Sequence, residues 1–116
     1  MAIFVDGVNI AHVPGTSLPV SVNTINGGDA TGPNAPIPAT NPQFYVDNHD
    51  PMFSAMDPYA ASAPVYNIQY DGTTANLTAQ TSISANVTYH IKIVIADVAD
   101  KNFDSAIFIR AQVPCP

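Results

Sequence analysis

Hydrophobic and polar residues alternate most regularly over residues 87–98 of the chain. Alternate positions of this stretch form one apolar row, whose members are Val87, Tyr89, Ile91, Ile93 and Ile95. Because successive side chains of a β-strand point to opposite faces, the row predicts a strand with one face packed on a core. Residues 105–113 alternate in the same way, and the intervening loop from Asp97 to Asp104 is too long for a two-residue hairpin turn.

Shorter strand-like stretches recur between turn residues, and none shows a helical stripe. They cover residues 2–5, 8–13, 18–25, 43–46, 64–70 and 75–83. Asp6 and Asn9 are predicted to fix a tight hairpin between the first two. The pattern predicts an all-β fold, an antiparallel β-sandwich resembling a jelly roll, as a single domain over residues 1–116. Two long irregular loops, at residues 26–42 and 48–64, are rich in proline and interrupt the strands.

Composition and charge narrow the function classes. With 47% hydrophobic and 10% charged residues, the chain is predicted to fold and to be neither a disordered tail nor a coiled coil. Its three cations, Lys92, Lys101 and Arg110, and its net charge of −6 exclude a basic face for nucleic acid. No apolar run is long enough for membrane insertion, and the amino terminus lacks the pattern of a signal peptide, so any signal or upstream region is expected to lie outside this chain.

Four segments together resemble a known family. They are Phe4-Val5-Asp6-Gly7 continuing to Thr16, then Pro19 to Asn26, then Tyr70-Asp71-Gly72 with Leu77-Thr78-Ala79, and finally Thr88 to Asp100 with Phe103 to Ile109. In this order they resemble the choice-of-anchor L domain over more than half of the chain. The resemblance implies a module of a large bacterial extracellular protein, secreted or located at the cell surface, with no enzymatic activity.

The sequence also departs from that family pattern. Family members have additional strands upstream of the segment matched by residues 2–13, so the resemblance covers the carboxyl portion of a longer domain. A sandwich without those strands would have open edges and exposed apolar faces, unless it closes differently or another chain completes it. The ending from Arg110 to Pro116 also replaces the short Ala-Gly ending usual in the family, which puts any inherited carboxyl-terminal linkage in doubt.

The loop after the strongest strand is the first candidate for a metal site. Asp97, Asp100 and Asp104, with Asn102, could supply the oxygen ligands that Ca²⁺ requires, although the spacing is not that of an EF-hand. The alternative is an ordinary turn in which these aspartates accept backbone N–H groups. Asp47 and Asp50, beside His49, form a second and weaker acidic candidate.

Aromatic residues are concentrated in the middle of the chain, partly on the irregular loops. Tyr45, Phe53, Tyr59 and Tyr66 are candidate ligand-binding residues, because exposed rings can stack on sugar faces while neighbouring polar groups bind hydroxyls. The alternative is that these rings form the core of a protein without tryptophan.

No motif for catalysis stands out. The histidines have no zinc spacing, no G-x-S-x-G elbow is present, and the chain lacks glutamate. We therefore predict a non-catalytic module of a bacterial secreted or surface protein, acting in adhesion or ligand binding, with a glycan or another surface protein as partner and with Ca²⁺ as a stabilising ion. The second hypothesis is a structural subunit that forms a homo-oligomer or filament by β-strand complementation through exposed sheet edges. A metal-dependent enzyme acting on polysaccharide is the third.

Overall fold

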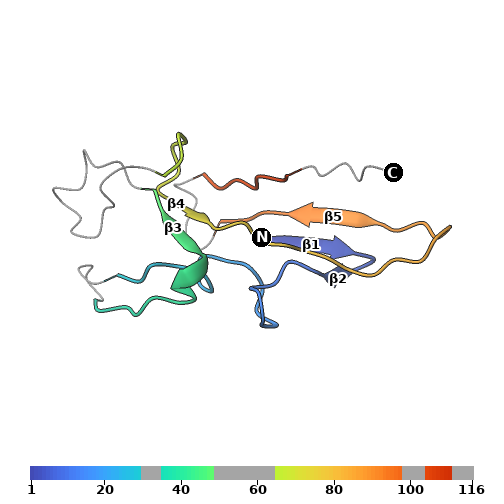
Figure 1. Cartoon of the computed structure of the whole chain (residues 1–116), viewed down its shortest axis with the longest axis horizontal. Coiled ribbons are helices and arrows are strands. Elements are labelled where there is room, and N and C mark those ends of the chain that lie inside the picture. Colours follow the sequence, from blue (N-terminus) through green and yellow to red (C-terminus); the bar gives the residue numbers. More distant parts are fainter. Residues whose placement is uncertain (30–34, 49–64, 98–103, 111–116) are drawn as a thin grey trace.

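The computed structural model describes residues 1–29, 35–48, 65–97 and 104–110, and its regular structure is almost entirely antiparallel β (Figure 1). The strands are β1 (Ala2–Val5), β2 (Val8–Asn9), β3 (Tyr45–Asp47), β4 (Gly72–Thr74) and β5 (Ile91–Val94), with a short 3₁₀ helix, η1 (Pro42–Phe44). They form a three-stranded sheet in the order β2-β1-β5 and a two-stranded sheet of β3 and β4. The predicted antiparallel all-β class is confirmed. The sandwich and jelly-roll arrangement stays a prediction.

The predicted hairpin between β1 and β2 is present. Asp6 and Gly7 form its two-residue turn with positive φ angles of 46° and 83°, as the twist of a β-hairpin favours. Asn9 fixes the strands, because its Oδ1 accepts the backbone N–H groups of Ile3 and Ala11, both at 3.1 Å. The local sequence therefore determines the register of this hairpin.

β5 pairs with the other side of β1, although the two strands are far apart in the sequence. The register places Ala2 opposite Val94, Ile3 opposite Ile93, Phe4 opposite Lys92 and Val5 opposite Ile91. Just beyond the strands, the Asp6 N–H donates to the His90 carbonyl at 2.9 Å. β1 is thus the central strand of this sheet.

The second sheet is extended by a buried polar side chain. Asn48, only 3% exposed, follows β3, and its backbone N–H donates to the Asp71 carbonyl at 2.7 Å. Its Nδ2 donates to the carbonyls of Ile68 and Tyr70 at 3.3 and 2.8 Å, while its Oδ1 accepts the Tyr66 N–H at 2.7 Å. One asparagine therefore fixes the chain over residues 65–71 against the end of β3.

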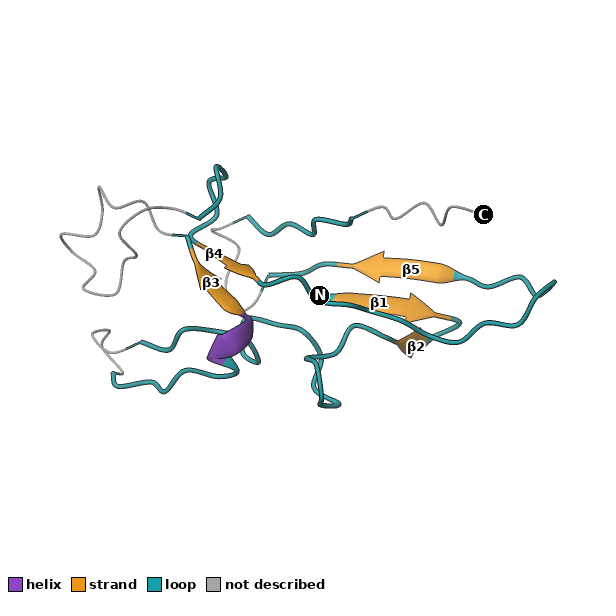
Figure 2. Cartoon of the chain, in the orientation of Figure 1, coloured by secondary structure: helices purple, strands orange, loops and turns teal. Residues whose placement is uncertain are grey.

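A small hydrophobic core lies between the two sheets and the long connection that joins them. Among the described residues, its buried members are Val13, Val20 and Ile25, and the half-buried side chains packed on them are Met1, Phe44, Tyr45 and Leu77. The molecule measures 56 × 30 × 27 Å, and much of the described chain is loop (Figure 2). Most of the apolar residues in the strands consequently lie outside this core.

Several predicted strands are wrong in the part of the chain that the structure describes. Residues 18–25, 75–83 and 105–110 contain no strand, and 65–70 is a series of bends. Over 18–25 the reason is local: the Thr24 hydroxyl donates to the Pro19 carbonyl at 2.6 Å and also accepts the Ser21 N–H at 2.9 Å. Such side-chain bonds compete with a β-ladder for backbone groups.

The apolar row at residues 87–98 is also placed differently from the expectation. β5 covers only Ile91–Val94, and the row does not face a core, because Ile91 and Ile93 are 69% and 49% exposed. The alternation correctly predicted a strand and its two faces. It could not predict whether anything covers the apolar face.

Candidate interaction surface

The three-stranded sheet has one apolar face, which we call the isoleucine face and define by Ile3, Val5, Val8, Ile91 and Ile93. Cross-strand partners of an antiparallel sheet lie on the same side, and the pairs that join these residues are Val5 with Val8, Val5 with Ile91 and Ile3 with Ile93. Val8 is 66% exposed, similar to Ile91. A contiguous exposed apolar surface of this kind is typical of a site that binds another molecule.

The opposite face of the sheet is mixed in character. Phe4, Gly7, His90 and Lys92 line an open hollow of about 380 Å³ there. The side chains of His90 and Lys92 reach it because they occupy alternate positions around β5. A phenyl ring beside an imidazole and an ammonium group gives this face some polar binding capacity, in contrast to the isoleucine face.

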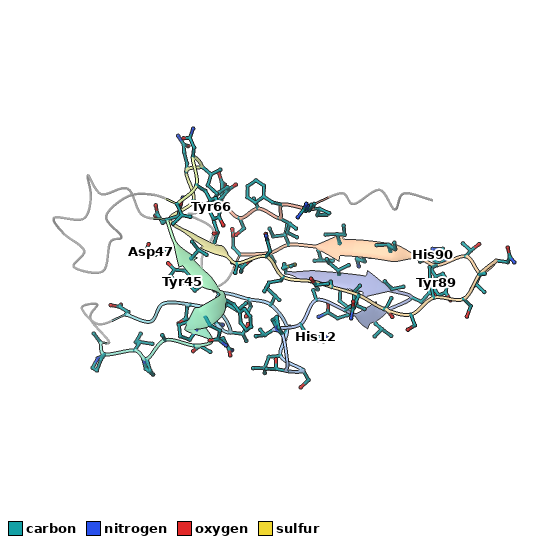
Figure 3. The ribbon with its side chains drawn as sticks, in the orientation of Figure 1. His12, Tyr45, Asp47, Tyr66, Tyr89 and His90 are labelled. Atoms are coloured by element: carbon teal, nitrogen blue, oxygen red, sulfur yellow. The ribbon has the colours of Figure 1, made fainter. Side chains whose placement is uncertain are left out.

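A second candidate surface lies at the other end of the chain's β-structure, and we call it the aromatic corner, formed by Tyr66, Tyr70 and Phe108. The rings of Tyr70 and Phe108 meet edge to face, with centroids 6.2 Å apart and planes at 79°. Phe108 is nevertheless 71% exposed, and Tyr66 is 44% exposed. Figure 3 shows Tyr66 on the segment that precedes β4. The contact between Tyr70 and Phe108 thus brings segments 65–71 and 104–110 together. The side chains of Phe108 and Tyr66 remain accessible to a ligand.

The predicted calcium loop is described only at its two ends. Asp97 and Asp104 are exposed, and the Ser105 hydroxyl donates to Asp97 Oδ1 at 2.5 Å, which closes the base of the loop. Asp100 and Asn102 lie outside the described residues. Within the described ranges, no group of three histidine, cysteine or acidic side chains is placed to hold a metal ion. Calcium binding therefore stays a prediction.

The second acidic candidate and the aromatic candidates are distributed over different surroundings. Asp47 is half-buried within β3, while Asp50, Phe53 and Tyr59 lie outside the described residues. Tyr45 packs on the core, and its ring lies so close to Gly27 and Gly72 that a Cβ at either glycine would be within 2.9 Å of it. Of the predicted ligand-binding rings that the structure describes, only Tyr66 lies on an exposed surface.

Two functional features were missed by sequence reasoning. Phe108 lies in the strand predicted at residues 105–113, although residues 104–110 pair with no strand in the described chain. Asn48, next to the acidic candidate Asp47, received no predicted role, although its buried side chain positions Tyr66 and Tyr70. The position of Asn48 at the boundary between a strand and a proline-rich loop is the only sequence signal that could have suggested a structural role.

These features place the chain in the class of antiparallel all-β modules. More specifically, the chain belongs to the choice-of-anchor L domain family, whose model matches residues 2–113. It is accordingly a surface-associated module of a bacterial extracellular protein. Comparison with curated proteins and with solved structures finds no match. In the described ranges of the chain, no helix is both long and apolar enough to cross a membrane.

Proposed function

We propose that this module is a non-catalytic adhesion module that binds carbohydrate through the aromatic corner. The supporting observation is the accessible ring surface of Tyr66 and Phe108, held in place by the buried Asn48 and by the contact with Tyr70. Aromatic rings bind the C–H faces of sugars, and polar groups beside them bind the hydroxyls. Asn67 and Gln69, both exposed on the same segment, supply such amide groups.

The proposal is tested by binding of the full chain to a panel of immobilised oligosaccharides. We expect at least one glycan to be retained, and we expect Tyr66→Ala and Phe108→Ala each to weaken its binding about tenfold or more. Ile83→Ala is the matched control, because Ile83 is 69% exposed but belongs to neither segment of the corner. Equal loss in the control, or binding that neither aromatic substitution changes, would assign the ligand to another surface.

The same experiment separates binding from catalysis. A module binds the oligosaccharide and releases it unchanged, whereas a polysaccharide-active enzyme shortens it on incubation. Chromatography of the oligosaccharide after prolonged contact with the protein, with and without added Ca²⁺, distinguishes the two. Cleavage products that depend on the protein would replace the adhesion proposal with the enzymatic one.

We propose further that Ca²⁺ stabilises the module at the loop between β5 and residue 104. The supporting observation is the bond between Ser105 and Asp97, which joins the two ends of the loop and brings the segments of Asp97 and Asp104 together. Ca²⁺ requires six to eight oxygen ligands, and carboxylates from a closed loop can supply several of them. The experiment that tests this proposal is a thermal unfolding comparison with calcium and with chelator.

A further inference from the structure

The structure points to a second copy of this chain as the occupant of the outer edge of β5, with which no strand of the described residues pairs. We propose that two copies pair β5 to β5, antiparallel, about a two-fold axis through Ile93. Each copy would contribute its sheet of three strands, giving one continuous sheet in the order β2-β1-β5-β5-β1-β2. This inference goes beyond carbohydrate binding, because no residue of the aromatic corner takes part in it.

The alternation of hydrogen-bonded residues along β5 shows which of its backbone groups face away from β1 and are directed to the outer edge. The Asp6 N–H donates to the His90 carbonyl, so the groups of residues 90, 92 and 94 face β1 and those of Ile91 and Ile93 face away from it. The bonds of Ile3 agree, because its N–H and carbonyl are directed to Asn9 and Ile10 of the opposite neighbour. In the described residues, no backbone hydrogen bond reaches this outer edge of β5.

The next described segment after β5 in the sequence does not complete the sheet. Residues 104–110 form no strand, and a side-chain hydrogen bond between Ser105 and Asp97 joins them to the chain just after β5. An edge with unpaired N–H and carbonyl groups is a ready template for another strand. Its exposed isoleucines add apolar contacts to such pairing.

The charge distribution favours a second copy as the partner. Each chain has a net charge of −6, which opposes most contacts between copies. Residues 72–96, however, contain no acidic residue, and their only formal charge is Lys92. The β5 edge is therefore a surface on which two copies can meet without bringing carboxylates together.

The position of Lys92 also selects the register. Pairing centred on Ile93 places Lys92 opposite Val94 of the second copy and pairs the outward-facing backbone groups of Ile91 with those of Ile95. Pairing centred on Lys92 would place the two ammonium groups directly opposite each other, which is unfavourable. With Ile93 on the axis, the isoleucine faces of both copies also join on one side of the sheet.

A charge-swap experiment tests this arrangement, because Ile93 is the one residue that would face its own copy. We expect the native chain to be dimeric by light scattering at about 100 µM. Ile93→Lys alone and Ile93→Asp alone each place like charges on the axis, and each is expected to raise the dissociation constant about tenfold or more. An equimolar mixture of the two variants pairs opposite charges and is expected to restore the dimer.

Controls keep the outcomes separate. Ile83→Lys, at an exposed position outside β5, is expected to leave the dimer unchanged, and circular dichroism verifies that each variant is folded. A native monomer at this concentration overturns the proposal, as does a dimer that survives both single substitutions or a mixture that fails to re-form it. Glycan binding by the folded monomeric variants shows that the aromatic corner works independently, so failure of either proposal leaves the other measurable.

Discussion

The carboxylate of Asp6 accepts the backbone N–H of His90 at 2.8 Å, across 84 positions of the sequence. Asp6 is also the first residue of the β1–β2 turn, where its φ angle of 46° lies in the left-handed region. One residue therefore both reverses the chain and closes the end of the pairing between β1 and β5. Local turn chemistry and long-range sheet formation are coupled at this position.

Substitution of Asp6 separates these two roles. Asp6→Ala removes the acceptor of the His90 N–H. It also places alanine, which lacks the polar group that helps aspartate adopt the left-handed conformation, at this turn position. We expect a loss of about 1 to 2 kcal/mol in the free energy of unfolding. Asp6→Asn keeps an Oδ1 acceptor and tolerates positive φ, and its loss should be about half as large or smaller. Denaturant titration of both variants measures the difference. Equal losses would show that the side-chain bond to His90 contributes nothing.

Asn48 should be far more sensitive than its exposed neighbours. Asn48→Ala removes a side chain that is only 3% exposed and leaves the carbonyls of Ile68 and Tyr70 and the N–H of Tyr66 without this partner, so we expect a loss of about 3 kcal/mol. Asn67→Ala is the matched control, because Asn67 is exposed, and it should change stability by about 0.5 kcal/mol or less. Similar unfolding midpoints for both variants would contradict the structural role of Asn48.

Local features of this fold could be predicted from the sequence where short-range chemistry determines them. The Asp6-Gly7 turn and the strand at residues 2–5 were predicted correctly, because turn preference and alternation act over a few residues. The alternation at β5 likewise identified the residues of each face. Whether that face is buried depends on which other segments reach it, and the exposed Ile91 shows that none does in the described chain.

The residues of the candidate sites could be predicted less well than the strands, because tertiary contacts decide which side chains stay accessible. Tyr45 and Tyr66 were both predicted to be ligand-binding rings, yet one ring packs on the core between two glycines and the other is accessible. The difference arises from tertiary contacts with Gly27 and Gly72, which adjacent sequence does not encode. Phe108 joined the aromatic corner only because its segment lies against Tyr70.

Two glycines with nearly the same positive φ angle provide a matched test of packing. Gly15 and Gly28 have φ angles of 77° and 78°, but a Cβ at Gly15 would meet nothing within 4 Å. A Cβ at Gly28 would lie 2.6 Å from the Ile37 carbonyl oxygen and 2.7 Å from the Ala39 nitrogen. Gly15→Ala should therefore cost about 1 kcal/mol from conformation alone, and Gly28→Ala about 3 kcal/mol or more. Equal unfolding free energies in denaturant would show that the chain near Ile37 moves away freely.

The calcium proposal predicts a melting temperature that depends on the ion through specific carboxylates. If Asp100 and Asp104 bind Ca²⁺, the native chain should melt several degrees higher with about 1 mM calcium than with chelator, because an ion that binds only the folded state stabilises it by mass action. The double variant Asp100→Asn with Asp104→Asn should lose this difference while leaving the Ser105 bond to Asp97 intact.

Asp71→Asn is the control for that experiment, because it removes the same charge from an exposed residue in the other sheet region. It should retain the full calcium response, since its backbone carbonyl, which accepts the Asn48 N–H, is unchanged by the substitution. A calcium response that persists in the double variant would place the ion elsewhere. A native chain that melts at the same temperature with calcium and with chelator would leave the loop as an ordinary turn, in which the aspartates only accept hydrogen bonds.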